Sequence, residues 1–354
     1  MPRHKPSHQL TDQQRRRISS IRERRLDRLE ERRREESARV LQAGDPVGEV
    51  LDGRVTAHFG LNVEVEESGG APSPEGRIPC RCAVRETVEM EPVCGDWVVW
   101  RRLGEDQGVI EGVKPRRTVL RRPGACERLR TLAANVDRLL VTASGVRFNP
   151  GLVDQYLVAA EAAGVEAVLV ISKMDLLDER ERTSLEGALA PYRAMGYGVV
   201  HTSLTGDLSE LMGELAGWTS VFSGQSGVGK STLVARLTGD ESVRIAPEDA
   251  TGGGQGRHTT TVARLYHLPG GGELIDSPGI RSFGLHGVDA SEVAGYFRDI
   301  APFIGHCKFG DCEHGEEPGC AVRAAVKAGR VDERRWESLR RIVRELENEQ
   351  SNPF

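Results

Sequence analysis

The sequence predicts three parts: a central α/β domain with a mostly parallel sheet, a small β-barrel before it, and a helical, metal-binding unit after it. Three observations lead to this prediction. A glycine-rich turn over 224–231 joins an apolar stretch to a helix-forming one. Apolar runs alternate with amphipathic stretches over 139–238, which is typical of parallel sheets covered by helices. Three cysteines and one histidine gather within 307–320. We assign the boundaries as 1–45, 46–115, 116–288 and 289–354.

Composition limits the class of protein. The 354 residues leave room for two or three domains, and a hydrophobic content of 38% supports a core. The net charge of -5 means that any basic surface must be local. No run of eighteen apolar residues and no apolar signal segment occurs, so we expect neither a membrane span nor secretion. Seven unevenly placed cysteines favour a reducing, cytoplasmic location over a disulfide framework.

The N-terminal extension, 1–45, is Arg-rich and expected to be partly helical. Residues 11–40 hold eleven arginines against seven acidic residues, with few apolar side chains between them. Two interpretations stay open: an arm that neutralises nucleic-acid phosphates, or a solvated helix held by its own salt bridges.

Five short β-prone segments separated by turn signals follow. Their number and length predict a barrel of the oligonucleotide-binding type, with an SH3-like barrel used for protein contact as the alternative. Cys80, Cys82 and Cys94 have no fourth ligand nearby, so we expect buried thiols and no metal. The basic stretch 114–130 is interpreted as the linker out of the barrel. The expected strands lie within 48–60, 62–67, 78–86, 95–103 and 108–113.

Alternating strands and helices begin after this linker. Ligands of parallel sheets bind beyond the carboxyl ends of the strands, and the motifs described below follow such ends. The expected strands are 139–144, 166–172 and 197–203, and the expected helices are 152–163 and 178–195.

The sequence GQSGVGKS, 224–231, has every fixed position of a phosphate-binding loop between a strand and a helix. Gly224 and Gly229 permit backbone angles that let successive N–H groups face phosphate oxygens. Lys230 is expected to reach the β- and γ-phosphates, and the Ser231 hydroxyl to bind Mg²⁺. The loop alone does not identify the nucleotide.

Two strand ends before the loop indicate guanine. Ser172-Lys173-Met174-Asp175 is similar to the Asn-Lys-x-Asp element of GTPases, in which the Asp carboxylate accepts hydrogens from guanine N1 and the exocyclic amine. Adenine lacks this pair of donors, which disfavours an ATPase or a small-molecule kinase. Ser172 replaces the usual Asn and weakens the expected contacts to the base and the phosphate loop, although a hydroxyl can still bond. Thr202-Ser203 begins a turn that resembles the guanine-supporting turn of GTPases.

Two segments after the loop have the character of switch regions. The glycine-rich stretch 251–261 offers Thr259 and Thr260 as Mg²⁺ ligands. In the DSPG sequence that begins at Asp276, this carboxylate would hold Mg²⁺ and the Gly279 N–H would face the γ-phosphate.

The position after Gly279 holds Ile280, where Ras-like enzymes carry the Gln that orients the attacking water. Isoleucine cannot orient water, so another group must do so. His258 is the nearest candidate, and its alternative is a loop histidine that contacts rRNA or solvent.

The order of these elements is itself informative. The usual order in GTPases is phosphate loop, switches and then guanine motifs, whereas here the guanine motifs come first. The chain is therefore predicted to be a circularly permuted GTPase.

The C-terminal part carries the metal signature Cys307-x4-Cys312-x-His314-x5-Cys320. Three thiolates and one imidazole at this density predict a closed, tetrahedral, structural zinc site with one ion per chain. His306 is a neighbouring alternative to His314 as the histidine ligand, and we favour His314. Helices are expected over 321–328 and 332–349.

Several motifs in this order together resemble the RsgA/YjeQ family of small-subunit-dependent GTPases: GDWV, AANVDRLLV, FSGQSGVGKST, GRHTTT, DSPG and the cysteine–histidine signature. The resemblance covers 46 to about 345. It implies an oligonucleotide-binding barrel, a permuted GTPase domain and a zinc domain. It also implies Cys307, Cys312, His314 and Cys320 as zinc ligands and matches His258 to a histidine proposed to act in hydrolysis. The implied nucleotide contacts, with the turn added, are Ser172, Lys173, Met174, Asp175, Thr202, Ser203, Ser223, Gly224, Gln225, Ser226, Gly227, Val228, Gly229, Lys230, Ser231 and Thr232.

The resulting functional hypothesis is a monomeric cytoplasmic GTPase that binds GTP and GDP and acts in late maturation of the small ribosomal subunit. The resemblance implies that this subunit stimulates hydrolysis, and we expect contact with its rRNA. The alternative is a non-hydrolysing RNA-binding assembly scaffold in which nucleotide is structural; the intact Lys230, Ser231 and Asp276 argue against it.

Overall fold

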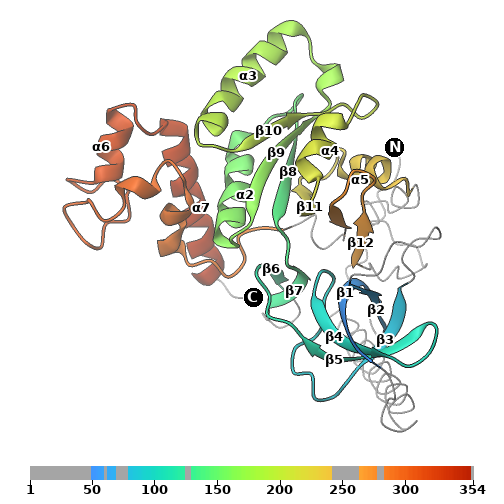
Figure 1. Cartoon of the computed structure of the whole chain (residues 1–354). Coiled ribbons are helices and arrows are strands. Elements are labelled where there is room, and N and C mark those ends of the chain that lie inside the picture. Colours follow the sequence, from blue (N-terminus) through green and yellow to red (C-terminus); the bar gives the residue numbers. More distant parts are fainter. Residues whose placement is uncertain are drawn as a thin grey trace, which may run out of the picture.

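The computed structural model describes six stretches of the chain and arranges them as a barrel, a central α/β sheet and a C-terminal helical unit (Figure 1). The N-terminal extension lies outside these stretches, so the two interpretations of it stay predictions. No helix within the described stretches is both long and apolar enough to span a membrane. The described residues are 49–59, 62–68, 79–123, 129–240, 263–276 and 283–351.

The N-terminal barrel has the predicted five strands. β1 pairs with both β2 and β4, β2 pairs with β3, β4 pairs with β5, and β3 runs parallel to β5, which closes the circuit. This is the topology of an oligonucleotide-binding fold. Trp100 fills the centre with no exposed surface, and a Cβ on Gly53 would lie 2.6 Å from its indole nitrogen. The strands are β1 (Val50–Phe59), β2 (Asn62–Glu67), β3 (Cys80–Val84), β4 (Trp97–Arg102) and β5 (Gln107–Val113).

The linker prediction for 114–130 is wrong. This stretch contains β6 (Val119–Pro123), which pairs with β7 (Leu129–Ala134) in a two-stranded antiparallel sheet. The basic, Pro- and Gly-containing composition concealed a short apolar segment, because Leu120 is completely buried against the central core. Its neighbour Arg121 stays exposed, as expected for a strand covered on one face.

The central sheet is mostly parallel, as predicted. Its strand order is β10-β9-β8-β11-β13-β12, with β12 antiparallel to β13 and all other neighbours parallel. β12 was not expected from the sequence. The strands are β8 (Arg138–Ser144), β9 (Glu166–Ser172), β10 (Gly198–His201), β11 (Thr219–Gly224), β12 (Ala263–His267) and β13 (Glu273–Asp276).

Helices cover both faces of this sheet, so successive strand residues enter different cores. Leu139 and Val141 join the core under α2 and α3, whereas Leu140 joins the core under α4 and α5. Burial on both faces explains why the strands read as continuous apolar runs. The helices are α2 (Pro150–Ala162), η2 (Met174–Leu176), α3 (Glu179–Ala194), α4 (Ser209–Leu215) and α5 (Lys230–Thr238).

The C-terminal helical unit is joined to α2 by a buried ion network. Arg335, with a side chain 1% exposed, contacts Asp154 of α2 at 2.5 Å and Asp299 at 2.9 Å. The Tyr192 hydroxyl donates to the same Asp154 carboxylate at 2.7 Å. Breaking one partner of such a buried network strongly destabilises a fold, so the helical unit is held in a fixed place. Its helices are η5 (Ala290–Tyr296), η6 (Ala301–Phe303), α6 (Ala321–Lys327) and α7 (Glu333–Ser351).

The barrel and the central sheet are continuous. β1 pairs with β12 through Ala57 opposite Arg264 and His58 opposite Ala263, so both parts form one eleven-stranded sheet. The rigid core of the protein therefore passes from the barrel into the strands beside the glycine-rich loop.

Candidate nucleotide and metal sites

The glycine-rich loop connects β11 to α5 at the carboxyl edge of the parallel strands. Gly224, Gly227 and Gly229 have φ angles of 141°, 76° and 99°, which residues with a Cβ rarely adopt. A Cβ on Gly224 would also lie 2.2 Å from the carbonyl oxygen of Thr142. These angles bring backbone N–H groups and the positive end of α5 to one place, which suits the binding of an anion.

Lys230 begins α5 and lies under this loop. Its side chain is buried, and its ammonium donates to the carbonyl oxygens of Gly224, at 2.7 Å, and of Gln225. Because the Lys230 ammonium is already held against the loop, it needs little rearrangement to contact the phosphate oxygens of a bound nucleotide.

The end of β9 is bonded directly to the glycine-rich loop. The Ser172 hydroxyl donates to the carbonyl of Val228 at 2.6 Å, and the Lys173 ammonium donates to that of Gly227 at 2.7 Å. The Ser172 hydroxyl, at the position where GTPases usually carry Asn, thus bonds directly to the phosphate loop. Lys173 adopts a left-handed φ of 60°, which turns the chain so that Asp175 lies exposed beyond the strand end.

The turn after β10 lies beside the same loop. The Thr202 carbonyl accepts a hydrogen bond from the Met174 N–H at 3.2 Å, so the two predicted guanine elements contact each other. A Cβ on Gly229 would lie 2.7 Å from Leu204, which shows how closely the turn packs on the glycine-rich loop.

Arg236, which sequence reasoning missed, fixes this turn. Its guanidinium donates to the carbonyl oxygens of Ser203, at 3.1 Å, and of Gly206. Nothing in the sequence near Arg236 indicates this role, because its partners precede it by about thirty residues.

Asp276 ends β13, which is hydrogen-bonded to β11 in parallel. This places its carboxylate at the same edge as the glycine-rich loop. The predicted residues His258, Thr259, Thr260 and Gly279, together with Ile280, lie outside the described residues.

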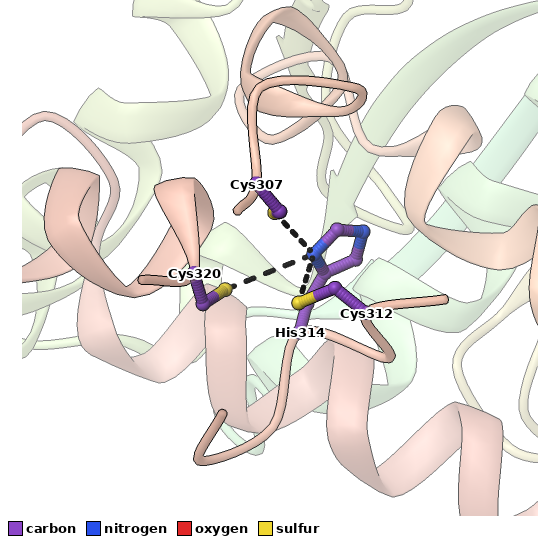
Figure 2. A group of neighbouring side chains, drawn as sticks. All are labelled: Cys307, Cys312, His314 and Cys320. Carbon is purple, nitrogen blue, oxygen red and sulfur yellow. Dashed lines mark hydrogen bonds between the residues drawn. The ribbon is translucent and has the colours of Figure 1, made fainter. Parts of the chain in front are cut away.

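The cysteine–histidine signature forms a cluster in the C-terminal unit (Figure 2). The sulfurs of Cys307, Cys312 and Cys320 lie 3.5, 3.7 and 3.8 Å from Nδ1 of His314. Tetrahedral zinc, with bonds of about 2.3 Å to sulfur and 2.0 Å to nitrogen, requires S–N separations of about 3.5 Å. The four residues therefore fit a zinc ion, with Nδ1 as the histidine ligand.

The surroundings of this cluster support metal-ligand chemistry. Backbone N–H groups of Ala321 and Arg323 donate to the sulfurs of Cys307 and Cys320, which favours thiolates. Partial burial lowers the pKa of His314, so its imidazole stays neutral and able to bind a metal. The Trp336 indole donates to the His314 carbonyl at 2.7 Å, a contact that the sequence did not predict.

The barrel cysteines form no such cluster. Cys80, Cys82 and Cys94 are at most 2% exposed, and burial raises the pKa of each thiol. The cysteine–histidine cluster is the single metal-competent group among the residues that the structure describes. The prediction of buried thiols in the barrel is confirmed.

Comparison with known proteins places this arrangement in a family. Residues 113–286 match the family model described as RsgA GTPase. A protein of Chromohalobacter salexigens named small ribosomal subunit biogenesis GTPase RsgA is 48% identical over 307 residues, which covers 86% of this chain and 88% of the relative. A Pseudomonas fluorescens protein of the same name is 43% identical and covers 96% of this chain and 97% of its own length.

Two solved structures have the same fold. The circularly permuted GTPase YloQ aligns with a TM-score of 0.68 and 26% identity, covering 86% of this chain and 97% of its own. YjeQ from Thermotoga maritima aligns with a TM-score of 0.68 and 29% identity, covering 84% and 99%. The predicted fold class, a permuted phosphate-loop domain between a barrel and a metal-competent helical unit, is confirmed.

Proposed function

The chain belongs to the RsgA GTPase family, and from this we infer that it is a GTP-hydrolysing enzyme that acts in biogenesis of the small ribosomal subunit. The observation that carries the assignment of the pocket is the bonding of the β9 end to the glycine-rich loop. Ser172 and Lys173 contact the carbonyls of Val228 and Gly227, so a base-recognition element and a phosphate cradle share one site.

The phosphate groups would lie against the loop N–H groups and the start of α5. We assign the loop, Ser223 to Thr232, to phosphate binding, with Lys230 neutralising the β- and γ-phosphates. Ser231 and Asp276 would hold the Mg²⁺ that a GTPase uses, and Thr259 or Thr260 would add a ligand from the first switch. The bound Mg²⁺ supplies charge neutralisation on the phosphates.

Base selection is assigned to the β9 end and the turn after β10. The Asp175 carboxylate, which is exposed beyond the strand end, can accept hydrogen bonds from both guanine N1 and the exocyclic amine. The turn at Thr202 and Ser203 lies beside it, and Arg236 holds the turn in place.

We expect Asp175→Asn to weaken GTP binding by about 2–3 kcal/mol, or roughly 30- to 150-fold in Kd, because a charged bidentate contact is lost. ATP affinity should not change, since adenine lacks the matching donors. Isothermal titration with both nucleotides measures this. Glu166→Gln, at the opposite end of β9, is the matched control; an unchanged GTP affinity of Asp175→Asn would remove Asp175 from the site.

Hydrolysis itself is assigned to the switch segments. Ile280 cannot orient water, so we propose slow intrinsic turnover and assign water positioning to His258. Contact with the small subunit would then position these segments for hydrolysis. The γ-phosphate N–H donor is assigned to Gly279.

The cysteine–histidine cluster is assigned to one structural zinc ion per chain. Four protein ligand atoms within 4.8 Å of one another would leave no open position for a substrate on a four-coordinate ion, which separates this site from a catalytic zinc. The ion would hold the loops that precede α6.

We place this activity in the cytoplasm of the cell, on a monomeric chain that binds rRNA through the barrel and the zinc domain. The test is the steady-state GTPase rate with and without small ribosomal subunits, with large subunits as an equally RNA-rich control. We expect stimulation by small subunits alone. Equal rates in all three conditions would refute the coupling.

A further inference from the structure

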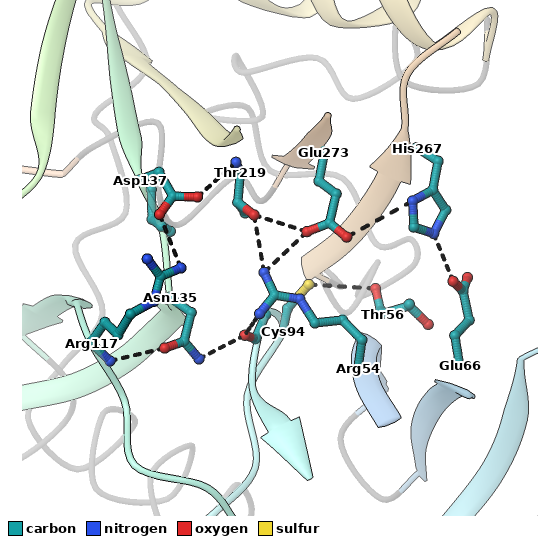
Figure 3. Close-up of polar contacts among 12 residues, drawn as sticks. Arg54, Thr56, Glu66, Cys94, Arg117, Asn135, Asp137, Thr219, His267 and Glu273 are labelled. Carbon is teal, nitrogen blue, oxygen red and sulfur yellow. Dashed lines mark hydrogen bonds and ion pairs between the residues drawn. The ribbon is translucent and has the colours of Figure 1, made fainter. Parts of the chain in front are cut away.

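The junction of the barrel with the central sheet carries a polar group, which we call the seam cluster: Arg54 and Glu66 from the barrel, and Thr219, His267 and Glu273 from the central sheet (Figure 3). The nucleotide and metal sites use none of these side chains. Burying polar side chains is costly unless they are hydrogen-bonded, and a hydrogen-bonded network makes a junction rigid, which makes the seam cluster a candidate for positioning.

Arg54 forms the centre of the seam cluster. Its side chain is 5% exposed, and its guanidinium contacts the Glu273 carboxylate at 3.0 Å and the Thr219 hydroxyl at 3.1 Å. It also donates to the Gly95 carbonyl at 2.6 Å within the barrel. One guanidinium therefore bonds both parts, and its planar shape fixes their mutual orientation.

His267 makes a second connection across the same junction. Its Nε2 lies 2.6 Å from the barrel carboxylate of Glu66, and its Nδ1 lies 3.9 Å from Glu273. The imidazole thus bridges a barrel side chain to the carboxylate that Arg54 holds.

The seam cluster lies on strands that lead to the nucleotide pocket. β12 begins directly after the glycine-rich segment 251–261, and β13 ends at Asp276 of the DSPG sequence. Across the sheet, Ala57 of β1 is paired with Arg264, which is paired in turn with Asp276. At the usual strand spacing, a barrel strand lies about 10 Å from the backbone of Asp276.

We propose that four members of the seam cluster are positioning residues: Arg54, Glu66, His267 and Glu273. Through them, contact of the barrel with the small subunit sets the position of Asp276 in the hydrolytic pocket. The proposal rests on the function proposed above and adds the route of stimulation. Because the β12–β13 hairpin is bonded to the barrel on one side and ends at Asp276 on the other, displacing the barrel displaces Asp276. Thermodynamic linkage requires the reverse as well, so the bound nucleotide also changes the affinity of the barrel for its partner.

The test compares Arg54→Met and Glu273→Gln with wild type in the full chain, measuring the basal GTPase rate, the rate with saturating small subunits and subunit affinity. We expect basal rates within about twofold and a stimulation ratio about fivefold lower or more, the lower end of typical coupling between sites. His267→Ala, at a side chain 41% exposed, is the second variant if the buried substitutions prevent folding. His267→Gln, which keeps a donor for Glu66, should restore part of the stimulation.

Lys114→Met is the matched control, because it removes another ion pair of the barrel, the solvent-exposed contact with Asp52 at 2.7 Å. It should leave the stimulation ratio at the wild-type value. Seam variants that are stimulated like wild type overturn the proposal while leaving the GTPase function intact. Equal loss of basal and stimulated rates assigns the seam cluster a merely structural role, and a wild type that subunits do not stimulate overturns both proposals.

Discussion

Lys230→Ala should lower kcat for GTP hydrolysis by about 100- to 1,000-fold, the usual effect of removing one preorganised group that stabilises transition-state charge. The expectation follows from the position of the Lys230 ammonium, which is buried beside the glycine-rich loop and contacts the Gly224 carbonyl. Phosphate-release kinetics under saturating GTP measure the effect.

Lys327→Ala, on the exposed surface of α6, is the control for the loss of a lysine. A wild-type rate in Lys230→Ala would exclude this pocket as the site of hydrolysis. If Lys230→Ala lost hydrolysis but still supported subunit binding and maturation, the protein would be a scaffold for which nucleotide is only structural.

Cys320→Ser should abolish stoichiometric zinc binding and unfold the loops of the C-terminal unit. Cys320 is buried, caps α6 and lies in the tetrahedral set, and structural zinc contributes about 10–16 kcal/mol of apparent binding free energy to such folds. Metal analysis gives the stoichiometry, and hydrogen exchange locates the loss of structure. Exchange should rise over 305–328 while the glycine-rich loop keeps its protection.

The matched control is Cys80→Ala, which removes an equally buried thiol from the barrel. It should cost some stability without changing the metal content. One zinc per chain in Cys320→Ser would contradict the assigned ligand set.

The sequence predicted those parts of the fold whose information is local. The spacing from Cys307 to Cys320 restricts four ligands to a short chain segment, and the structure brings their ligand atoms within 4.8 Å of one another. The barrel strands were recognisable as short β-prone segments between turn signals, and the parallel strands were recognisable because burial on both faces leaves continuous apolar runs.

Prediction failed where a segment depends on distant partners. The stretch that contains β6 was predicted to be a linker because residues 114–130 are basic and include Pro and Gly, although Leu120 is buried by residues of the central core. The roles of Asp175 and Lys230 in nucleotide binding stay predictions that the experiments above test.

What the sequence alone determined is the residue types and spacing of each motif and their permuted order, which predict a phosphate cradle, a guanine element and a metal site. What only the tertiary structure decided is how these pieces are joined. Ser172 bonds the carbonyl of Val228, Arg236 holds a turn that precedes it, and β12 pairs with β1 to merge barrel and sheet. The physical reason is that backbone angles and ligand spacing are properties of neighbours in the chain. The contacts made by Ser172 and Arg236 instead join residues 30 to 56 positions apart, and β1 and β12 are more distant still, so these contacts depend on how whole elements pack.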